Sequence, residues 1–198
     1  MEKIAIYGGS FDPPHKGHKL LALNLAKACG AGKVIIIPAA TSPFKEGTSA
    51  SSEDRLNMCR LAFDDELFEV SDVEIKRGGK SYTVDTVAHI KSLYPEARLY
   101  LFMGEDMLLS FNKWYKYKEI LQMCSIVAAC RTENLEKLEE MKRFAFDILG
   151  LDGDRAIICE STPIQISSTE IRESIKNGTV KELDDNVFKY IELRGLYK

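Results

Sequence analysis

The chain has 198 residues, of which 45% are hydrophobic and 29% are charged. These values are typical of a soluble globular protein and exclude collagen, coiled-coil arrays and intrinsic disorder. With 27 Lys and Arg against 30 Asp and Glu, the net charge is −3, which argues against a general nucleic-acid-binding protein because such proteins are usually clearly basic. The length and the lack of a linker predict one domain over residues 1–198.

The cysteine pattern and the N-terminal sequence indicate in which cellular compartment the protein is expected. Five cysteines are present without a CxxC pair, a pattern that predicts reduced, buried thiols rather than a disulfide framework or a metal cluster. The N-terminal apolar run is too short for a signal peptide, and no stretch reaches the ~20 apolar residues of a membrane span. We therefore expect a cytoplasmic protein without a membrane segment.

Short apolar runs alternate with longer amphipathic runs along the chain. The short runs predict strands over residues 4–7, 34–37, 68–75, 99–103, 126–129 and 156–159. The amphipathic runs predict helices over residues 18–29, 51–63 with its cap, 83–94, 134–149, 168–176 and 184–193. Residues 41–52 and 77–81 are expected to form loops.

Strands that alternate with helices of about ten residues are typical of βαβ units. The predicted fold class is α/β, a Rossmann-like, doubly wound parallel sheet with helices on both faces. Such sheets bind ligands beyond the carboxyl ends of the strands, where the direction of winding reverses. Chemistry is therefore expected in the loops after Ile6, Ile37, Met103, Ala129 and Cys159.

The loop after the first predicted strand reads GGSFDPPHKGH over residues 8–18. Gly8 and Gly9 allow close approach of the backbone to a ligand and offer N–H donors. His15 and His18 are three residues apart at a helix start, so both side chains can project to one side. Either histidine alone would be better explained as a surface residue. Together with the positive end of the helix dipole, the whole loop predicts a cradle for a polyphosphate.

A second motif, ISSTEIR, occupies residues 166–172. Ser167 or Ser168 can cap a helix that has Glu170 in its first turn. Arg172 lies one turn inside, and its planar guanidinium can clamp a phosphate through two hydrogen bonds. Alone, this motif is better explained as a helix cap with a surface arginine; beside the first motif, it suggests a second phosphate-binding element.

The two motifs resemble the two signatures of the HxGH nucleotidyltransferases. Between them, SYTVDT at 81–86, GEDM at 104–107 and KW at 113–114 are similar to segments of bacterial nicotinate-nucleotide adenylyltransferases. The resemblance covers nearly the whole chain. It implies adenylyl transfer from ATP to nicotinate mononucleotide, with release of pyrophosphate, in NAD biosynthesis. It also implies that the C-terminal helices close over the nucleotide site.

The resemblance implies roles for individual residues. The catalytic residues would be His15, His18 and Arg172, with His18 stabilising charge at the α-phosphate. The ATP-binding residues would be Gly8, Gly9, Ser10, Phe11, His15, His18, Lys45, Ile166, Ser167, Ser168 and Arg172. The residues that bind nicotinate mononucleotide would be Gly9, Ser10, Lys45, Tyr82, Thr83, Asp106, Trp114 and Arg131. Asp12 is expected to fix the turn rather than to act in catalysis.

On the acceptor side, Trp114 offers a flat face to a pyridinium ring, although it could equally be a core residue. The nicotinate carboxylate would suit the N–H groups of the helix that begins at Thr83. A neutral carboxamide would gain less there, which predicts a preference for the acid over the amide. Asp106 and Arg131 are candidates for contacts with ribose and phosphate.

The implied reaction needs neither a general base nor a covalent intermediate. The acceptor phosphate is already mostly dianionic at neutral pH, because its second pKa is about 6. In-line attack then depends on positioning and on charge neutralisation, with Mg²⁺ accompanying ATP and no metal held by protein side chains.

Three alternatives stay open. The acceptor could be nicotinamide mononucleotide or phosphopantetheine, or the chain could be a nucleotide sensor without catalysis. The chain could also form a homodimer. Two positions depart from the family pattern. Phe44 stands where many members have a histidine, and Glu105 stands where alanine is common; the first departure leaves any contact of that histidine in doubt.

Overall fold

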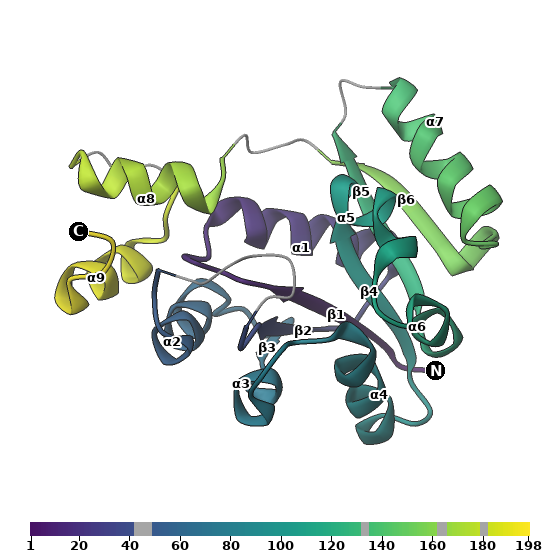
Figure 1. Ribbon diagram of the computed structural model, residues 1–198, viewed down its shortest axis with the longest axis horizontal. Coiled ribbons are helices and arrows are strands. Elements are labelled where there is room, and N and C mark those ends of the chain that lie inside the picture. Colours follow the sequence, from purple (N-terminus) through teal and green to yellow (C-terminus); the bar gives the residue numbers. More distant parts are fainter. Residues whose placement is uncertain (42–48, 132–134, 162–165, 179–181) are drawn as a thin grey trace. The chain divides into compact units, whose positions relative to one another are not determined.

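The computed structural model describes residues 1–41, 49–131, 135–161, 166–178 and 182–198 (Figure 1). The chain divides into two compact units. The first unit comprises Met1–Tyr7, Leu21–Val34 and Tyr82–Pro163, and the second comprises Gly8–Leu20, Ile35–Ser81 and Ile164–Lys198. That the whole chain forms one domain stays a prediction.

The described residues form a six-stranded sheet in the order β3-β2-β1-β4-β5-β6. The strands are β1 (Lys3–Gly9), β2 (Lys33–Pro38), β3 (Phe68–Val70), β4 (Arg98–Gly104), β5 (Ser125–Arg131) and β6 (Ala156–Ser161). β1 pairs in parallel with β4, β4 with β5, and β5 with β6. The winding reverses between β1 and β4, as in doubly wound folds, so the predicted α/β class is confirmed.

Helices precede and follow these strands along the chain (Figure 1). They are α1 (Lys16–Cys29), α2 (Ser52–Ala62), α3 (Val73–Arg77), α4 (Thr83–Leu93), α5 (Glu105–Leu109), α6 (Tyr117–Met123), α7 (Leu135–Arg143), α8 (Ser168–Lys176) and α9 (Asp185–Arg194). Shorter turns are η1 (Phe111–Lys113), the π-helical η2 (Phe144–Ile148) and η3 (Gly153–Arg155). No helix in the described ranges is both long and apolar enough to cross a membrane.

The prediction of a strand over residues 68–75 is wrong in its second half. β3 ends at Val70, and α3 occupies Val73–Arg77. A helix of five residues is too short to display a period of 3.6, so its apolar alternation was indistinguishable from that of a strand. The helix ends at Gly78, whose φ of 68° lies in the left-handed region that glycine adopts without strain.

The core of the first unit is built on β4 and β5. Residues 99–103 of β4 are each at most 3% exposed, and β5 lies between β4 and β6 in the sheet. Because strands of a parallel sheet are covered on both faces, their sequences are continuous apolar runs. α7 contacts β5 and β6 and runs beside them in Figure 1.

All five cysteines lie in the described part of the chain, and none forms a disulfide. Cys29, Cys59, Cys124 and Cys130 are buried, and Cys159 is half-buried. Burial raises the pKa of the Cys124 thiol to about 12, so this thiol is unreactive at neutral pH. The predicted burial is confirmed for four of the five thiols, and their reduced state stays a prediction.

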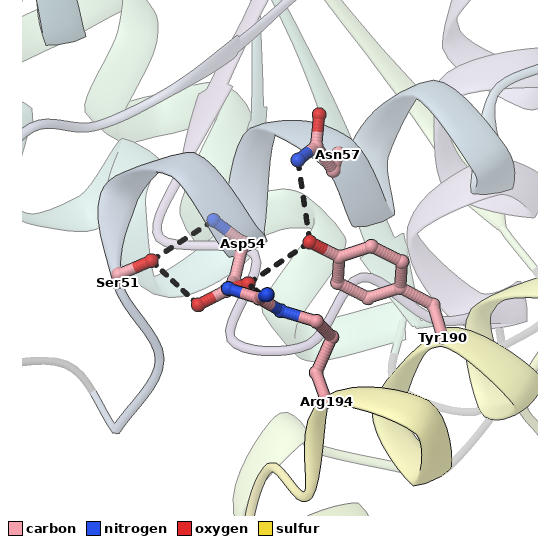
Figure 2. A network of polar contacts seen from close by, with 5 residues as sticks. All are labelled: Ser51, Asp54, Asn57, Tyr190 and Arg194. Carbon is pink, nitrogen blue, oxygen red and sulfur yellow. Dashed lines mark hydrogen bonds and ion pairs between the residues drawn. The ribbon is translucent and has the colours of Figure 1, made fainter.

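In the second unit, Asp54 joins α2 to α9 (Figure 2). The Tyr190 hydroxyl and the Arg194 Nε donate to Asp54 Oδ1 at 2.9 and 3.2 Å. Ser51 caps α2 by accepting from the Asp54 N–H, and its hydroxyl donates to Asp54 Oδ2 at 2.6 Å. Asn57 donates to the Tyr190 oxygen at 3.2 Å. The bond from Ser51 is the main reason why the pKa of the Asp54 carboxyl is lowered.

We predict that Asp54→Asn lowers the free energy of unfolding at pH 7 by about 1–3 kcal/mol, because the donors lose a charged acceptor. The folded-state pKa of Asp54 lies below its unfolded value. Its contribution is therefore present above about pH 4 and is lost as the pH falls through the folded-state pKa. Urea unfolding at pH 7 and at pH 3 measures both effects. Equal stability of the variant and the original chain at pH 7 would contradict the prediction.

Candidate active site

The turn after β1 is fixed by its own aromatic residue. Phe11 is 2% exposed, has a φ of 47°, and meets the rings of His18 and Phe63 edge to face at 5.1 and 5.8 Å. A Cβ at Gly9 would lie 3.0 Å from the Phe11 ring, so a larger residue at this position would have to displace that ring. Because the Phe11 side chain is buried, only its backbone can contact a ligand.

The two histidines of the first motif stack on each other. The ring centroids of His15 and His18 are 3.7 Å apart, at 33°. The His15 backbone N–H donates to His18 Nδ1 at 3.2 Å, and the His15 carbonyl accepts from the His18 N–H at 2.9 Å. The prediction that both side chains project to one side is confirmed.

Burial sets the protonation state of His15, which is only 7% exposed. Burial lowers its pKa to about 4, and the Glu170 carboxylate opposes this shift. His15 is therefore neutral at neutral pH, and its Nδ1 has no hydrogen-bond partner among the described residues. The Nδ1 of His18 accepts a hydrogen bond, so a neutral His18 ring has its proton on Nε2, which is a donor. A ring N–H donor suits an anionic oxygen.

Asp12 fixes the turn, as the sequence predicted. Its Oδ2 accepts from the Ser49 N–H at 2.7 Å. Its Oδ1 accepts from the Ala50 N–H at 3.1 Å and from the Tyr197 hydroxyl at 2.7 Å. With three donors on its carboxylate, Asp12 is a structural acceptor rather than a general base.

Arg55 is a residue of the site that the motifs did not reveal. Its side chain is fully buried, and its guanidinium donates to the Ser10 carbonyl at 2.7 Å and to the Ala39 carbonyl at 2.6 Å. It thereby joins the first motif to the segment after β2. A sequence signal did exist, because Arg55 shares one helical face with Cys59 and Ala62, both buried. A cation on an apolar face is unusual.

The second motif begins α8 with a capping box. Ser167 Oγ accepts from the Glu170 N–H at 3.2 Å, and Glu170 Oε2 accepts from the Ser167 N–H at 2.6 Å. Ser167 is therefore the cap that the sequence had assigned to either serine. Its binding of ATP stays a prediction.

The two motifs meet within the second unit. Ser168 Oγ donates to the Pro13 carbonyl at 2.9 Å. Arg172 donates from Nη1 to the Asp12 carbonyl at 2.7 Å and from Nη2 to Thr169 Oγ1 at 3.1 Å. A guanidinium has five N–H donors, so these two bonds do not exhaust its capacity. The predicted convergence of the two ends of the chain is confirmed.

Two of the predicted acceptor segments of the first unit have aromatic contacts. Tyr82 precedes α4, whose first residue is Thr83, and its ring lies 4.7 Å from that of Tyr115. Trp114 ends η1, is half-buried, and packs its ring 5.0 Å from that of Phe111. Trp114 thus has one side in the core and part of its surface in solvent, which fits either interpretation of this residue.

For three of the remaining predicted residues, the structure gives a position in the fold. Asp106 is exposed in the first turn of α5, Arg131 ends β5, and Ile166 is half-buried ahead of α8. Lys45 lies outside the described residues, as does Phe44. Within the described ranges, no group of three or more His, Cys, Asp or Glu side chains is placed to hold a metal ion.

Known sequences resemble this chain over most of its length. The cytidylyltransferase-like family model matches residues 6–174. A relative from Aquifex aeolicus named "Probable nicotinate-nucleotide adenylyltransferase" is 41% identical over 166 residues, covering 83% of this chain and 98% of the relative. A relative of the same name from Oceanobacillus iheyensis is 34% identical over 200 residues, covering 100% of this chain and 97% of the relative.

Solved structures share the fold. A Plasmodium falciparum nicotinic acid mononucleotide adenylyltransferase complexed with NaAD has a TM-score of 0.74 at 18% identity, covering 100% of this chain and 98% of that chain. Its complex with APC gives 0.70 at the same identity and coverage. The structures show the fold alone, and the sequences show the family. The chain belongs to the cytidylyltransferase-like family and, with these relatives, to the nicotinate-nucleotide adenylyltransferases.

Proposed function

We propose that this chain transfers the adenylyl group of ATP to nicotinate mononucleotide, giving nicotinate adenine dinucleotide and pyrophosphate in NAD biosynthesis. The contact between the two motifs carries the proposal, because Arg172 donates to Asp12 in the loop that leads to the stacked His15 and His18. The names of the relatives support this activity, and a structural neighbour was solved with NaAD.

The reaction is a displacement at the α-phosphorus. An oxygen of the acceptor phosphate forms a bond to this phosphorus, and the bond between it and the α–β bridging oxygen breaks. Pyrophosphate leaves with the electron pair of that bond. Since the acceptor is already an anion, the protein must bring two anions together and stabilise the charge of the leaving group.

Residues of the second unit suit this task. The Nε2–H of His18 would donate to an oxygen of the α-phosphate. His15 beside it would stay neutral near pH 7, because burial lowers its pKa. Arg172 would hold the triphosphate through its remaining donors. We propose the same for Lys45 and for the backbone N–H groups of the first motif.

Mg²⁺ would neutralise part of the triphosphate charge. The described residues offer no group of three metal-ligating side chains, and the Asp12 carboxylate already accepts from three donors. We therefore propose that the ion arrives on the triphosphate rather than on a site of the protein.

The acceptor would use the first unit. The exposed part of the Trp114 ring would stack on the pyridinium, with about 0.5–2 kcal/mol of cation–π attraction. The N-terminus of α4 at Thr83 would bind the nicotinate carboxylate, and Asp106 and Arg131 would contact ribose and phosphate. We propose the cytoplasm as the location and these small molecules as the partners, with no nucleic acid or membrane; the proposal does not require a homodimer.

An acceptor comparison tests the proposed function. Purified chain with Mg²⁺ and ATP receives nicotinate mononucleotide, nicotinamide mononucleotide or phosphopantetheine, and pyrophosphate release is measured. We predict release with the acid and a kcat/KM lower by about tenfold or more with the amide, because the amide gains less from the helix dipole. Preference for the amide would contradict the role of α4. ATP binding by calorimetry without pyrophosphate release from any acceptor would indicate a sensor and contradict the enzyme.

We predict that His18→Ala lowers kcat by about a hundredfold or more, because a donor at the developing charge is lost. The melting temperature should fall only modestly, because the half-buried His18 ring accepts one described hydrogen bond, from the His15 N–H. His89→Ala is the matched control, because His89 is an exposed histidine of α4, and its kcat should equal that of the original chain. An unchanged kcat in His18→Ala would remove His18 from this role.

The lowered pKa of His15 predicts a pH dependence of stability. Its pKa is about 4 in the folded chain against an ordinary value of 6.5, so below pH 6.5 the unfolded chain gains a proton first. Protonation of this residue in the unfolded chain therefore lowers the free energy of unfolding by up to about 3 kcal/mol as the pH falls from 6.5 to 4. Urea unfolding of His15→Gln should show a shallower loss over this interval. Parallel pH profiles for the two chains would contradict the burial effect.

A further inference from the structure

Tyr197 follows α9 and lies against Asp12 of the first motif. Its side chain is 8% exposed, and its hydroxyl donates to Asp12 Oδ1 at 2.7 Å. The direction of this terminal segment is set at Gly195, which has a φ of 63° and ends α9, and by the bond from the Leu196 N–H to the Ile191 carbonyl at 3.0 Å. Burial and the Asp12 carboxylate raise the pKa of Tyr197, so its hydroxyl is a permanent donor.

Asp12 collects donors from three separate segments of the second unit. Ser49 and Ala50 donate from the backbone ahead of α2, Arg172 donates to the Asp12 carbonyl from α8, and Tyr197 donates from the terminal segment. Asp12 is three residues ahead of His15, on the same turn. Each donor therefore restrains the path of the backbone into the stacked histidines.

We propose that Tyr197 is a positioning residue for adenylyl transfer, acting through Asp12 on the loop that leads to His15 and His18. This inference rests on the proposed function. Without the Tyr197 hydroxyl, Asp12 Oδ1 keeps only the Ala50 N–H, at 3.1 Å, as a described donor. Both remaining bonds to the carboxylate then come from one segment, the Ser49 and Ala50 N–H groups, so the tie between the turn and the segment after α9 is lost and the turn is held less firmly. Small displacements of groups at a reacting centre have large effects on rate.

The same C-terminal segment provides a matched control. Tyr190 also donates a hydroxyl hydrogen bond to a buried aspartate, Asp54, at 2.9 Å. That bond joins α9 to α2 (Figure 2) and does not involve the first motif. Tyr190→Phe and Tyr197→Phe each remove one hydroxyl that donates to a buried aspartate. Tyr190→Phe also removes the acceptor of the Asn57 bond, so the control loses at least as many contacts, and only Tyr197→Phe alters the first motif.

The test is steady-state pyrophosphate release at saturating ATP and acceptor. Tyr197→Phe should lower kcat by about tenfold, whereas its KM for the acceptor should change by less than about twofold. Tyr190→Phe should leave kcat within about twofold of the original chain, with a similar fall in melting temperature for both variants. Equal kcat values for the two variants would contradict the role of Tyr197. Failure of the unsubstituted chain to release pyrophosphate would instead contradict the proposed function.

Asp12→Asn tests the same link from its other end, and its own kcat remains informative if Tyr197→Phe does not fold. A residue that acts only through Asp12 has little further effect once Asp12 is changed. The double variant should therefore have a kcat within about twofold of Asp12→Asn alone. A double variant whose kcat loss is the product of the two single losses would contradict the inference, as would an Asp12→Asn variant with full activity.

Discussion

The hydrogen bond from Arg172 to the Asp12 carbonyl is the contact on which the rest of the site depends. Its two residues are 160 positions apart in the chain, so it closes a very long loop at an entropic cost. The Ser168 hydroxyl on the Pro13 carbonyl and the Tyr197 hydroxyl on Asp12 Oδ1 close similar loops beside it. Together they attach the C-terminal segment to the turn after β1, and neither motif has this geometry alone.

Charge explains why the site is built from these groups. Arg55 is fully buried, and its described hydrogen bonds are to carbonyls and a hydroxyl. Arg172 adds a second cation, while Asp12 supplies one carboxylate. His15 stays neutral because it is buried. The Glu170 carboxylate also acts on His15, so the turn favours an anion such as a triphosphate through the remaining N–H donors of Arg172 rather than through an excess of positive charge.

The positions of most strands could be predicted because buried parallel strands are continuous apolar runs in the local sequence. Residues 99–103 and 126–129 are apolar runs that can only be buried, and the helix at 168–176 begins with its own cap. The short helices between residues 105 and 123 were not predicted, since five to seven residues show no reliable period. The same limit explains the error at 73–75.

The sequence predicted the two motifs of the candidate site, but it did not predict the residues that hold these motifs in place. Residues that resemble a family signature identified His15, His18 and Arg172 without any coordinates. Arg55 and Tyr197 act through contacts that join distant segments, and such contacts leave little trace in local sequence. A fully buried arginine shows only as a cation on an apolar helix face, and Tyr197 shows only as an aromatic residue near the end of the chain.

The most direct measurement is a crystal structure of this chain with Mg²⁺ and a non-hydrolysable ATP analogue. The convergence of the two motifs on one ligand predicts a single triphosphate that contacts both His18 and Arg172. A triphosphate that lies against only one of the two motifs, or against neither, would contradict the central claim.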